Sequence, residues 1–190
     1  MKIGLFFGSF NPIHTGHLII ASFMANYTDL EQVWLVVSPH NPLKDKSALI
    51  NMYDRLEMAK IATENAENIR VSDIEFKLPQ PSYTIDTLTY LQERYPEHQF
   101  SLIMGSDNLK SLKKWKNYEL ILRDYSILIY PRPGYENSEL ENHPSVTVTQ
   151  TPQMEISSTF IRKAIQEGKN VQFFIPDEVL KFIESKNLYH

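Results

Sequence analysis

Short apolar runs alternate along the chain with longer segments in which apolar residues recur every three or four positions. The short runs, rich in β-branched and aromatic residues, predict strands or extended segments at residues 3–7, 33–37, 69–74, 75–78, 100–104, 126–130 and 146–149. The periodic segments predict helices at residues 15–27, 51–65, 84–95, 117–122, 158–167 and 176–185. Gly168 follows one of these helices and is expected to end it. The proline-containing segments 38–49 and 131–144 are predicted to be loops.

This order of elements predicts an α/β fold, a Rossmann-like doubly wound parallel sheet with helices on both faces. No internal repeat or linker divides the chain. Residues 1–190 are therefore expected to form a single domain, with a C-terminal helical part from about residue 152. Sheets of this kind bind ligands beyond the carboxyl ends of their strands. The loops that leave the strands are thus the segments in which to look for chemistry.

Composition narrows the class of protein. Apolar residues make up 42% and charged residues 22% of the chain, as in an ordinary globular protein. The net charge of -4 argues against a protein that wraps nucleic acid. The absence of Cys excludes disulfides, thiolate nucleophiles and zinc–thiolate sites. No apolar run approaches the roughly 18 residues of a membrane span, so we expect a cytoplasmic protein without a membrane or nucleic-acid partner. A homo-oligomer is compatible with the sequence.

The first predicted strand leads into the segment Gly8-Ser9-Phe10-Asn11-Pro12-Ile13-His14-Thr15-Gly16-His17. Gly8 permits close backbone approach or a positive φ. Ser9 and the amides after it can donate to an anion, and the following helix turns its positive N-terminus toward the same place. His14 and His17, three positions apart, share a face and can both donate to phosphate oxygens. An ordinary turn, or a histidine pair that binds a metal, is the alternative interpretation.

A second candidate anion site opens the helix predicted at residues 158–167. Ser157, Ser158 and Thr159 cluster at its start, and Arg162 lies about one turn further on. One serine, Ser157 or Ser158, is expected to cap the helix. Three hydroxyls and a guanidinium exceed what capping requires, so this pattern indicates an anion site.

Together these two segments resemble the nucleotidylyltransferase superfamily, which combines Phe-Asp/Asn-Pro, His-x-Gly-His and a later Ile-Ser-Ser-Thr followed by Arg. One position departs from the pattern, because Phe7 stands where many bacterial members have a first glycine. The resemblance implies ATP as substrate, with Mg²⁺ accompanying it and no metal ligand from the protein. It implies phosphate binding by Gly8, Ser9, Phe10, Ser157, Ser158, Thr159 and Arg162. It implies catalytic roles for His14, His17 and Arg162.

Three middle segments bear on the second substrate. They are Ser82-Tyr83-Thr84-Ile85-Asp86-Thr87, Gly105-Ser106-Asp107, and the stretch around Trp115. Each has an ordinary interpretation: Thr84 as a helix N-cap, Asp107 as the cap of a short helix after Gly105, and Trp115 as a core residue. An indole can equally stack on a flat ring such as a pyridine.

With Arg132-Pro133-Gly134, these segments resemble the bacterial nicotinate-nucleotide adenylyltransferase family, and the likeness covers nearly the whole chain. It implies transfer of AMP from ATP to nicotinate mononucleotide in NAD biosynthesis, giving nicotinate adenine dinucleotide and pyrophosphate. It implies an acceptor site made of Lys44, Thr84, Gly105, Asp107, Trp115, Lys116 and Arg132. Pro42-Leu43-Lys44 matches the family's loop only in part, and a solvated Lys44 is the alternative interpretation.

Other functions remain open at this point. The acceptor could be nicotinamide mononucleotide or another phosphate-bearing molecule such as phosphopantetheine, and the protein could be a non-catalytic nucleotide sensor or a plain structural module. A class I aminoacyl-tRNA synthetase also has a His-x-Gly-His motif, but this chain is too short and lacks a Lys-Met-Ser-Lys-Ser segment. The adenylyltransferase hypothesis requires His17 and Arg162 to face one shared cavity.

Overall fold

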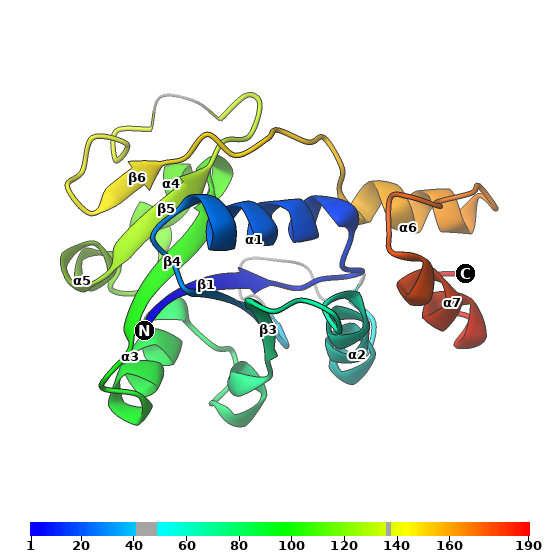
Figure 1. Ribbon diagram of the computed structural model, residues 1–190, viewed down its shortest axis with the longest axis horizontal. Helices are drawn as coiled ribbons and strands as arrows, with labels where there is room; N and C mark the ends of the chain where they lie inside the picture. The colour runs from blue at the N-terminus through cyan, green and yellow to red at the C-terminus, as the bar shows by residue number, and fades with distance from the viewer. Residues whose placement is uncertain (41–48, 136–137) are drawn as a thin grey trace.

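A computed structural model describes residues 1–40, 49–135 and 138–190 (Figure 1). These residues form a six-stranded sheet in the order β3-β2-β1-β4-β5-β6, and every neighbouring pair of strands is parallel. The strands are β1 (Lys2–Gly8), β2 (Gln32–Val37), β3 (Ile69–Ser72), β4 (Gln99–Gly105), β5 (Ser126–Tyr130) and β6 (Val146–Val148). The strand order reverses between β1 and β4. The predicted doubly wound parallel sheet is confirmed.

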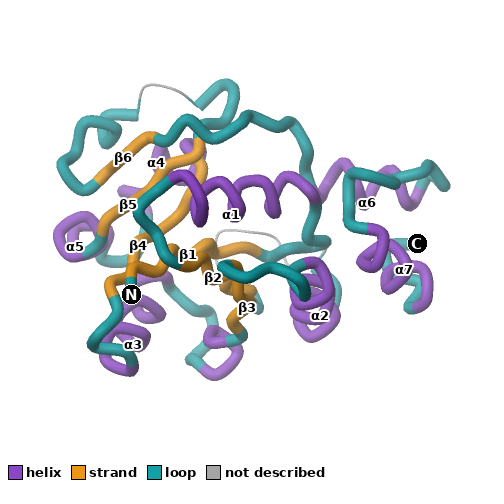
Figure 2. Tube along the Cα trace, viewed as in Figure 1, coloured by secondary structure: helices purple, strands orange, loops and turns teal. Residues whose placement is uncertain are grey.

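Helices cover both faces of the sheet, as predicted (Figures 1 and 2). They are α1 (Thr15–Tyr27), α2 (Met52–Ala62), α3 (Thr84–Arg94), α4 (Ser106–Ser111), α5 (Tyr118–Asp124), α6 (Ser158–Gln166) and α7 (Asp177–Ser185), with 3-10 turns η1 (Ile74–Lys77) and η2 (Leu112–Lys114). Successive strand residues bury opposite faces: Phe6 packs in the core with α1, α2, α6 and α7, and Leu5 packs in the core with α3, α4 and α5.

The segment after β3 differs from the prediction. An extended chain was expected over residues 69–78, but the strand ends at Ser72 and residues 74–77 form η1. The apolar residues of this segment alternate as in a strand, yet Phe76 N donates to Asp73 O at 2.9 Å and closes a tight turn. The turn buries Ile74 against the sheet and carries the adjacent Glu75 to the carboxyl edge of the sheet, where it is 2% exposed.

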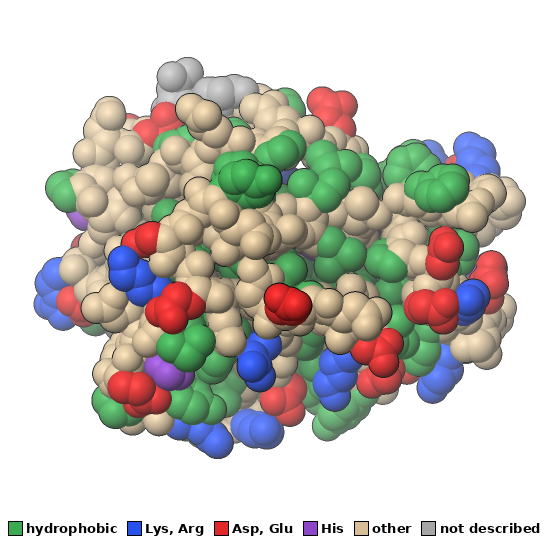
Figure 3. All heavy atoms as spheres, in the orientation of Figure 1, with side chains coloured by type: hydrophobic (Ala, Val, Ile, Leu, Met, Phe, Trp, Pro, Cys, Tyr) green, Lys and Arg blue, Asp and Glu red, His purple; other side chains and the backbone are tan. Residues whose placement is uncertain are grey.

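The C-terminal helices belong to the same core as α1. Ile161, Val179 and Ile183 pack in one apolar cluster with residues of β1 and β2, and α7 lies beside α2 (Figure 1). Gly168 follows α6 with a φ of 66°, so the predicted helix end is confirmed. In the part of the chain that the structure describes, every helix is too short or too polar to cross a membrane. Acidic and basic side chains interleave on the face drawn in Figure 3.

Candidate active site

The loop after β1 bends sharply at Phe10. Phe10 has a φ of 46°, and its ring is 2% exposed. A Cβ atom at Gly8 would lie 2.8 Å from Phe10 Cζ, so the glycine is required by the approach of this ring. A positive φ at Gly8 was one predicted reason for the glycine; this was wrong, because the positive-φ glycines of the described chain are Gly134 and Gly168. With its ring buried, Phe10 offers an anion only its backbone amide.

A buried guanidinium holds this loop from behind. Arg55 of α2 is 1% exposed and donates to the carbonyl oxygens of Ser9 (2.6 Å), Ser38 (2.7 Å) and Pro39 (2.9 Å). Burial lowers the pKa of Arg55, but an arginine stays charged in proteins. The sequence analysis missed Arg55, because a charged residue within a predicted helix carries no signal that it will be buried. It joins the loop after β1 to the loop after β2.

The two histidines lie side by side at the start of α1. Their ring centroids are 3.6 Å apart with an interplanar angle of 26°. The backbone N–H of His14 donates to Nδ1 of His17 at 3.2 Å, so a neutral His17 carries its proton on Nε2. Burial, and secondarily the charge of Arg132, lower the pKa of His14 to about 4. His14 is therefore neutral near pH 7 and carries a single ring N–H.

The buried neutral His14 predicts that acid destabilises the fold. Its pKa falls from 6.5 in the unfolded chain to about 4 in the folded protein, so the unfolded chain binds more protons between these values. The free energy of unfolding then decreases as the pH falls through this window. We expect wild type to lose about 2 kcal/mol more than His14→Gln between pH 7.5 and pH 5, measured by urea unfolding. The control variant His190→Gln, at an exposed position, should lose as much stability over this pH range as wild type. If His14→Gln also loses as much as wild type, His14 is not the group responsible for the pH dependence.

The two predicted phosphate elements are in direct contact. Ser157 caps α6 by accepting from Phe160 N at 3.2 Å, which resolves the choice between the two serines. Ser158 Oγ donates to the carbonyl oxygen of Pro12 at 2.9 Å. Arg162 donates from Nη1 to Asn11 O at 2.9 Å and from Nη2 to Thr159 Oγ1 at 3.3 Å. The start of α6 is thus bound to the loop after β1.

These contacts enclose a cavity of about 370 Å³ at the carboxyl edge of the sheet. Its polar lining includes Ser9, His14, His17, Asp107, Asn108, Arg132, Ser157, Ser158, Thr159 and Arg162. His17 and Arg162 share this cavity, as the hypothesis requires. Two guanidinium groups and the first turns of two helices make it suited to an anion. We call it the phosphate cavity.

Asp107 and Arg132 form an ion pair in this cavity, at 3.0 Å. Asp107 is not the cap of α4, because Gly105 holds that position, so the capping interpretation was wrong. A Cβ atom at Gly105 would collide with Asp107 Oδ1, which explains the glycine. Asp107 Oδ1 is buried and has no hydrogen-bond partner among the described residues, so it can accept from a ligand hydroxyl.

A second cavity, of about 260 Å³, adjoins the first and shares Phe7, Gly8, Ser9 and Asn108 with it. Thr84, Trp115 and Lys116 line this second cavity, which we call the ring cavity. Thr84 is not the N-cap of α3, because Tyr83 takes that position. Trp115 is half-buried and both packs against the core and faces the cavity.

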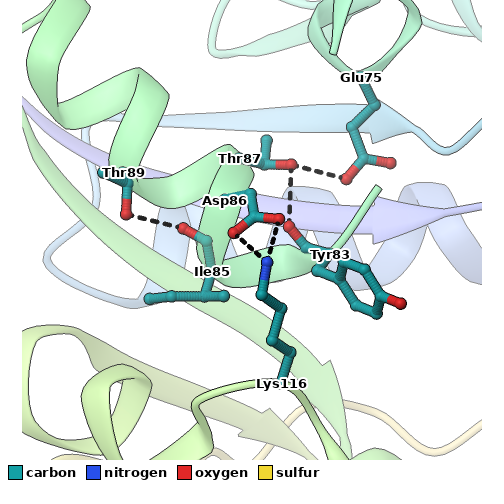
Figure 4. A network of polar contacts seen from close by, with 7 residues as sticks. All are labelled: Glu75, Tyr83, Ile85, Asp86, Thr87, Thr89 and Lys116. Carbon is teal, nitrogen blue, oxygen red and sulfur yellow. Dashed lines mark hydrogen bonds and ion pairs between the residues drawn. The ribbon is translucent and has the colours of Figure 1, made fainter. Parts of the chain in front are cut away.

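An ion pair joins two walls of the ring cavity. Lys116 Nζ donates to both carboxylate oxygens of Asp86, at 2.9 and 2.8 Å, and lies 4.9 Å from the centroid of the Tyr83 ring (Figure 4). Lys116 follows Trp115, and Asp86 lies in the first turn of α3. The contact therefore joins the segment that carries Trp115 to the start of α3, which carries Thr84.

Glu75 is a cavity residue that the sequence analysis missed. Its Oε1 accepts from Thr87 Oγ1 at 2.9 Å (Figure 4). Burial raises the pKa of Glu75, and the hydrogen bond from Thr87 opposes that rise. The residue lies in a segment predicted to be extended, so only the turn at η1 brings it into the ring cavity.

The residues predicted to bind the acceptor divide between the cavities. Thr84, Trp115 and Lys116 line the ring cavity, whereas Asp107 and Arg132 line the phosphate cavity, and Gly105 lies against Asp107. Lys44 lies outside the described residues. Within the described ranges, no group of three His, Asp or Glu side chains is arranged to hold a metal ion.

A doubly wound parallel sheet with a phosphate cavity at the reversal of its strand order defines a nucleotide-binding α/β protein. The model of the cytidylyltransferase-like family matches residues 5–164. A protein of Flavobacterium johnsoniae named probable nicotinate-nucleotide adenylyltransferase is 58% identical over 100% of this chain and 99% of its own length. A Bacteroides fragilis protein of the same name is 46% identical, over 96% of this chain and 90% of its own. The chain belongs to the nicotinate-nucleotide adenylyltransferases, within the cytidylyltransferase-like family.

A solved structure has the same fold. Plasmodium falciparum nicotinic acid mononucleotide adenylyltransferase complexed with NaAD superposes with a TM-score of 0.83, over 99% of this chain and 97% of the other, at 22% identity. A second structure of the Plasmodium protein, complexed with APC, has a TM-score of 0.82 at 22% identity, over 99% of this chain and 96% of the other.

Proposed function

We propose that the protein transfers the adenylyl group of ATP to the phosphate of nicotinate mononucleotide, forming nicotinate adenine dinucleotide and pyrophosphate. The observation that carries this proposal is the pair of adjoining cavities, one suited to a polyanion and one bounded by Trp115. Ser9 and Asn108 lie between the two cavities, where the acceptor phosphate would meet the triphosphate. Relatives that match nearly the whole chain and carry the corresponding name support the same reaction.

The chemistry needs positioning more than a nucleophile from the protein. A phosphate oxygen of the acceptor attacks the α-phosphorus of ATP, a new P–O bond forms, and the bond to the bridging oxygen of the leaving pyrophosphate breaks. A phosphate monoester is already anionic near pH 7, so it requires no strong general base. Holding two anions in line, and neutralising the charge that develops on the leaving group, then supplies the catalysis.

The phosphate cavity offers donors for each part of the triphosphate. We assign His17 Nε2–H as a donor to the α-phosphate, and the adjacent His14 as a second donor there. Arg162 takes the leaving end, together with Thr159. Because the hydroxyls of Ser157 and Ser158 are engaged with Phe160 N and Pro12 O, these two residues would contribute through the first-turn amides of α6.

Mg²⁺ enters with ATP in this proposal. The described lining of the phosphate cavity provides a single carboxylate, Asp107. This donor set fits an ion bound mainly by phosphate oxygens and water, and we assign it no protein ligand. Its contribution is to neutralise part of the triphosphate charge.

The ring cavity favours an acid over an amide acceptor. Tyr83, the N-cap residue of α3, provides no side-chain cap, and Tyr83 and Thr84 at the start of this helix line the cavity. A helix N-terminus stabilises a carboxylate, and the lining also contains Lys116, whose ammonium is paired with Asp86. The carboxylate of a nicotinate ring stacked on Trp115 would receive both.

Pyrophosphate release with ATP and a panel of acceptors tests the proposed function. We expect turnover with nicotinate mononucleotide to exceed turnover with nicotinamide mononucleotide and with phosphopantetheine. Faster turnover with the amide would reverse the assignment of the acceptor. ATP binding in a calorimeter without turnover on any acceptor would favour the nucleotide sensor.

Trp115→Ala is expected to raise KM for the acceptor by roughly tenfold, because stacking of a base on an aromatic side chain contributes about 1–3 kcal/mol. The KM for ATP should change little, since Trp115 lines only the ring cavity. Trp115→Phe should retain most of the affinity. Trp34, on β2 between Tyr95 and Phe100, provides the control variant Trp34→Phe. An unchanged acceptor KM in Trp115→Ala would return this residue to a purely structural role.

A further inference from the structure

Tyr189, which follows α7, reaches the loop after β1. Its hydroxyl donates to Oδ1 of Asn11 at 2.9 Å, between residues 178 positions apart in the sequence. Both side chains are buried, with Tyr189 9% and Asn11 4% exposed. Tyr189 takes a φ of 68°, in the left-handed region that such side chains rarely adopt. A buried hydrogen bond and a strained backbone together place this phenol against the phosphate loop.

The Asn11–Pro12 pair is held from the C-terminal part of the chain at three points. Tyr189 donates to the side chain of Asn11, Arg162 Nη1 donates to its main-chain oxygen, and Ser158 Oγ donates to the main-chain oxygen of Pro12. In the sequence, Asn11 lies between Phe10 and His14. Both of these residues line the phosphate cavity, so their positions determine which donor groups face a ligand there. Arg162 and Ser158 also line that cavity, whereas Tyr189 lines neither the phosphate cavity nor the ring cavity.

The surroundings of the phenol fix the direction of its hydrogen bond. Burial raises the pKa of Tyr189, against the opposing charges of Arg162 and Arg55. The phenol is therefore a neutral O–H donor at every pH at which the enzyme would work. Neither guanidinium can accept a hydrogen bond, so the proton of Tyr189 is directed to Asn11.

We propose that Tyr189 is a positioning residue for ATP: it orients Asn11 and thereby sets the phosphate loop from Ser9 to His14, without touching the substrate. The inference rests on the proposed function only for the identity of the nucleotide. According to this proposal, the segment after α7 supports the ATP site from outside the cavity, although neither of the two phosphate-binding segments of the sequence includes Tyr189.

Tyr189→Phe removes one hydroxyl and keeps the ring that fills the core, so the variant is expected to fold. Calorimetry with ATP should show a dissociation constant raised by about tenfold. In pyrophosphate release, kcat/KM for ATP should fall by a similar factor, while KM for nicotinate mononucleotide stays within about twofold. Tyr125→Phe is the matched control, because Tyr125 directly precedes β5 and lines neither the phosphate cavity nor the ring cavity. That variant should bind ATP as wild type does.

A double-mutant cycle that combines Tyr189→Phe with Asn11→Ala shows whether Tyr189 acts through Asn11. We expect the double variant to bind ATP no more weakly than Asn11→Ala alone. Wild-type affinity for ATP in Tyr189→Phe, or fully additive losses in the cycle, would overturn the proposal. Equal rises in both KM values with a matching loss of thermal stability would also overturn it, since a general structural role has that effect. Because ATP binding is measured without an acceptor, absent turnover in wild type would defeat the proposed function alone.

Discussion

His17→Ala is expected to lower kcat by about 10²–10³-fold, the usual effect of removing one preorganised donor to a developing charge. His17 Nδ1 accepts from the backbone N–H of His14, so Nε2–H is the donor that the proposed function assigns to the α-phosphate. The ring also lies 5.1 Å from the Phe10 ring, nearly edge-on to it, and this packing holds the imidazole in one orientation. Steady-state kinetics with saturating nicotinate mononucleotide measure the effect.

The pattern of the losses distinguishes a catalytic His17 from a structural one. KM for the acceptor should remain within about threefold, because His17 lines the phosphate cavity and not the ring cavity. His98→Ala is the control, since His98 stacks on the Tyr95 ring away from both cavities. His17→Asn should recover part of the lost rate, because its amide can donate. Near-normal turnover in His17→Ala would remove His17 from the catalytic role.

Arg162→Lys is expected to lower kcat/KM for ATP by roughly 100-fold although the charge is preserved. The planar guanidinium spans Asn11 O and Thr159 Oγ1 with two nitrogens while facing the phosphate cavity. An ammonium cannot reproduce this fork. In this variant the loop after β1 loses one of its supports, and under the proposed function the leaving pyrophosphate would lose a fixed donor.

Arg123→Lys provides the matched control for this prediction. Arg123 also donates from two nitrogens, to both oxygens of Asp124, but on the exposed surface of α5. Its replacement should leave both KM values and kcat unchanged. Wild-type kinetics in Arg162→Lys would mean that charge alone suffices at this position and that the fork geometry has no role.

The elements with strong local signals were predicted closely. The helix predicted at residues 15–27 has the same bounds as α1, and Ser157 and Gly168 end α6 as a cap and a left-handed residue. Such features depend on a few neighbouring residues, so a sequence contains the information they need. The 3-10 turn at residues 74–77 was not predicted, because an alternating apolar pattern fits a strand equally well until the surrounding sheet decides.

The same division applies to the candidate site. His14, His17 and the hydroxyls before Arg162 were predicted as site residues because motifs place them at helix starts, where anions bind, and all of them line the phosphate cavity. Arg55, Glu75 and Tyr189 carried no signal. Each is an ordinary residue in the sequence, and each becomes important through burial against a segment that is distant along the chain.

The sequence by itself determined the strands of the parallel sheet, the helices α1, α2, α3, α5, α6 and α7, and the two segments predicted to bind phosphate, because periodicity, capping and turn residues act over a few positions. Only the tertiary structure decided that His17 and Arg162 share one cavity, that Trp115 faces a second cavity beside it, and that Tyr189 bonds Asn11. Burial and hydrogen bonding between distant residues depend on how the whole chain packs, and local patterns do not encode that packing.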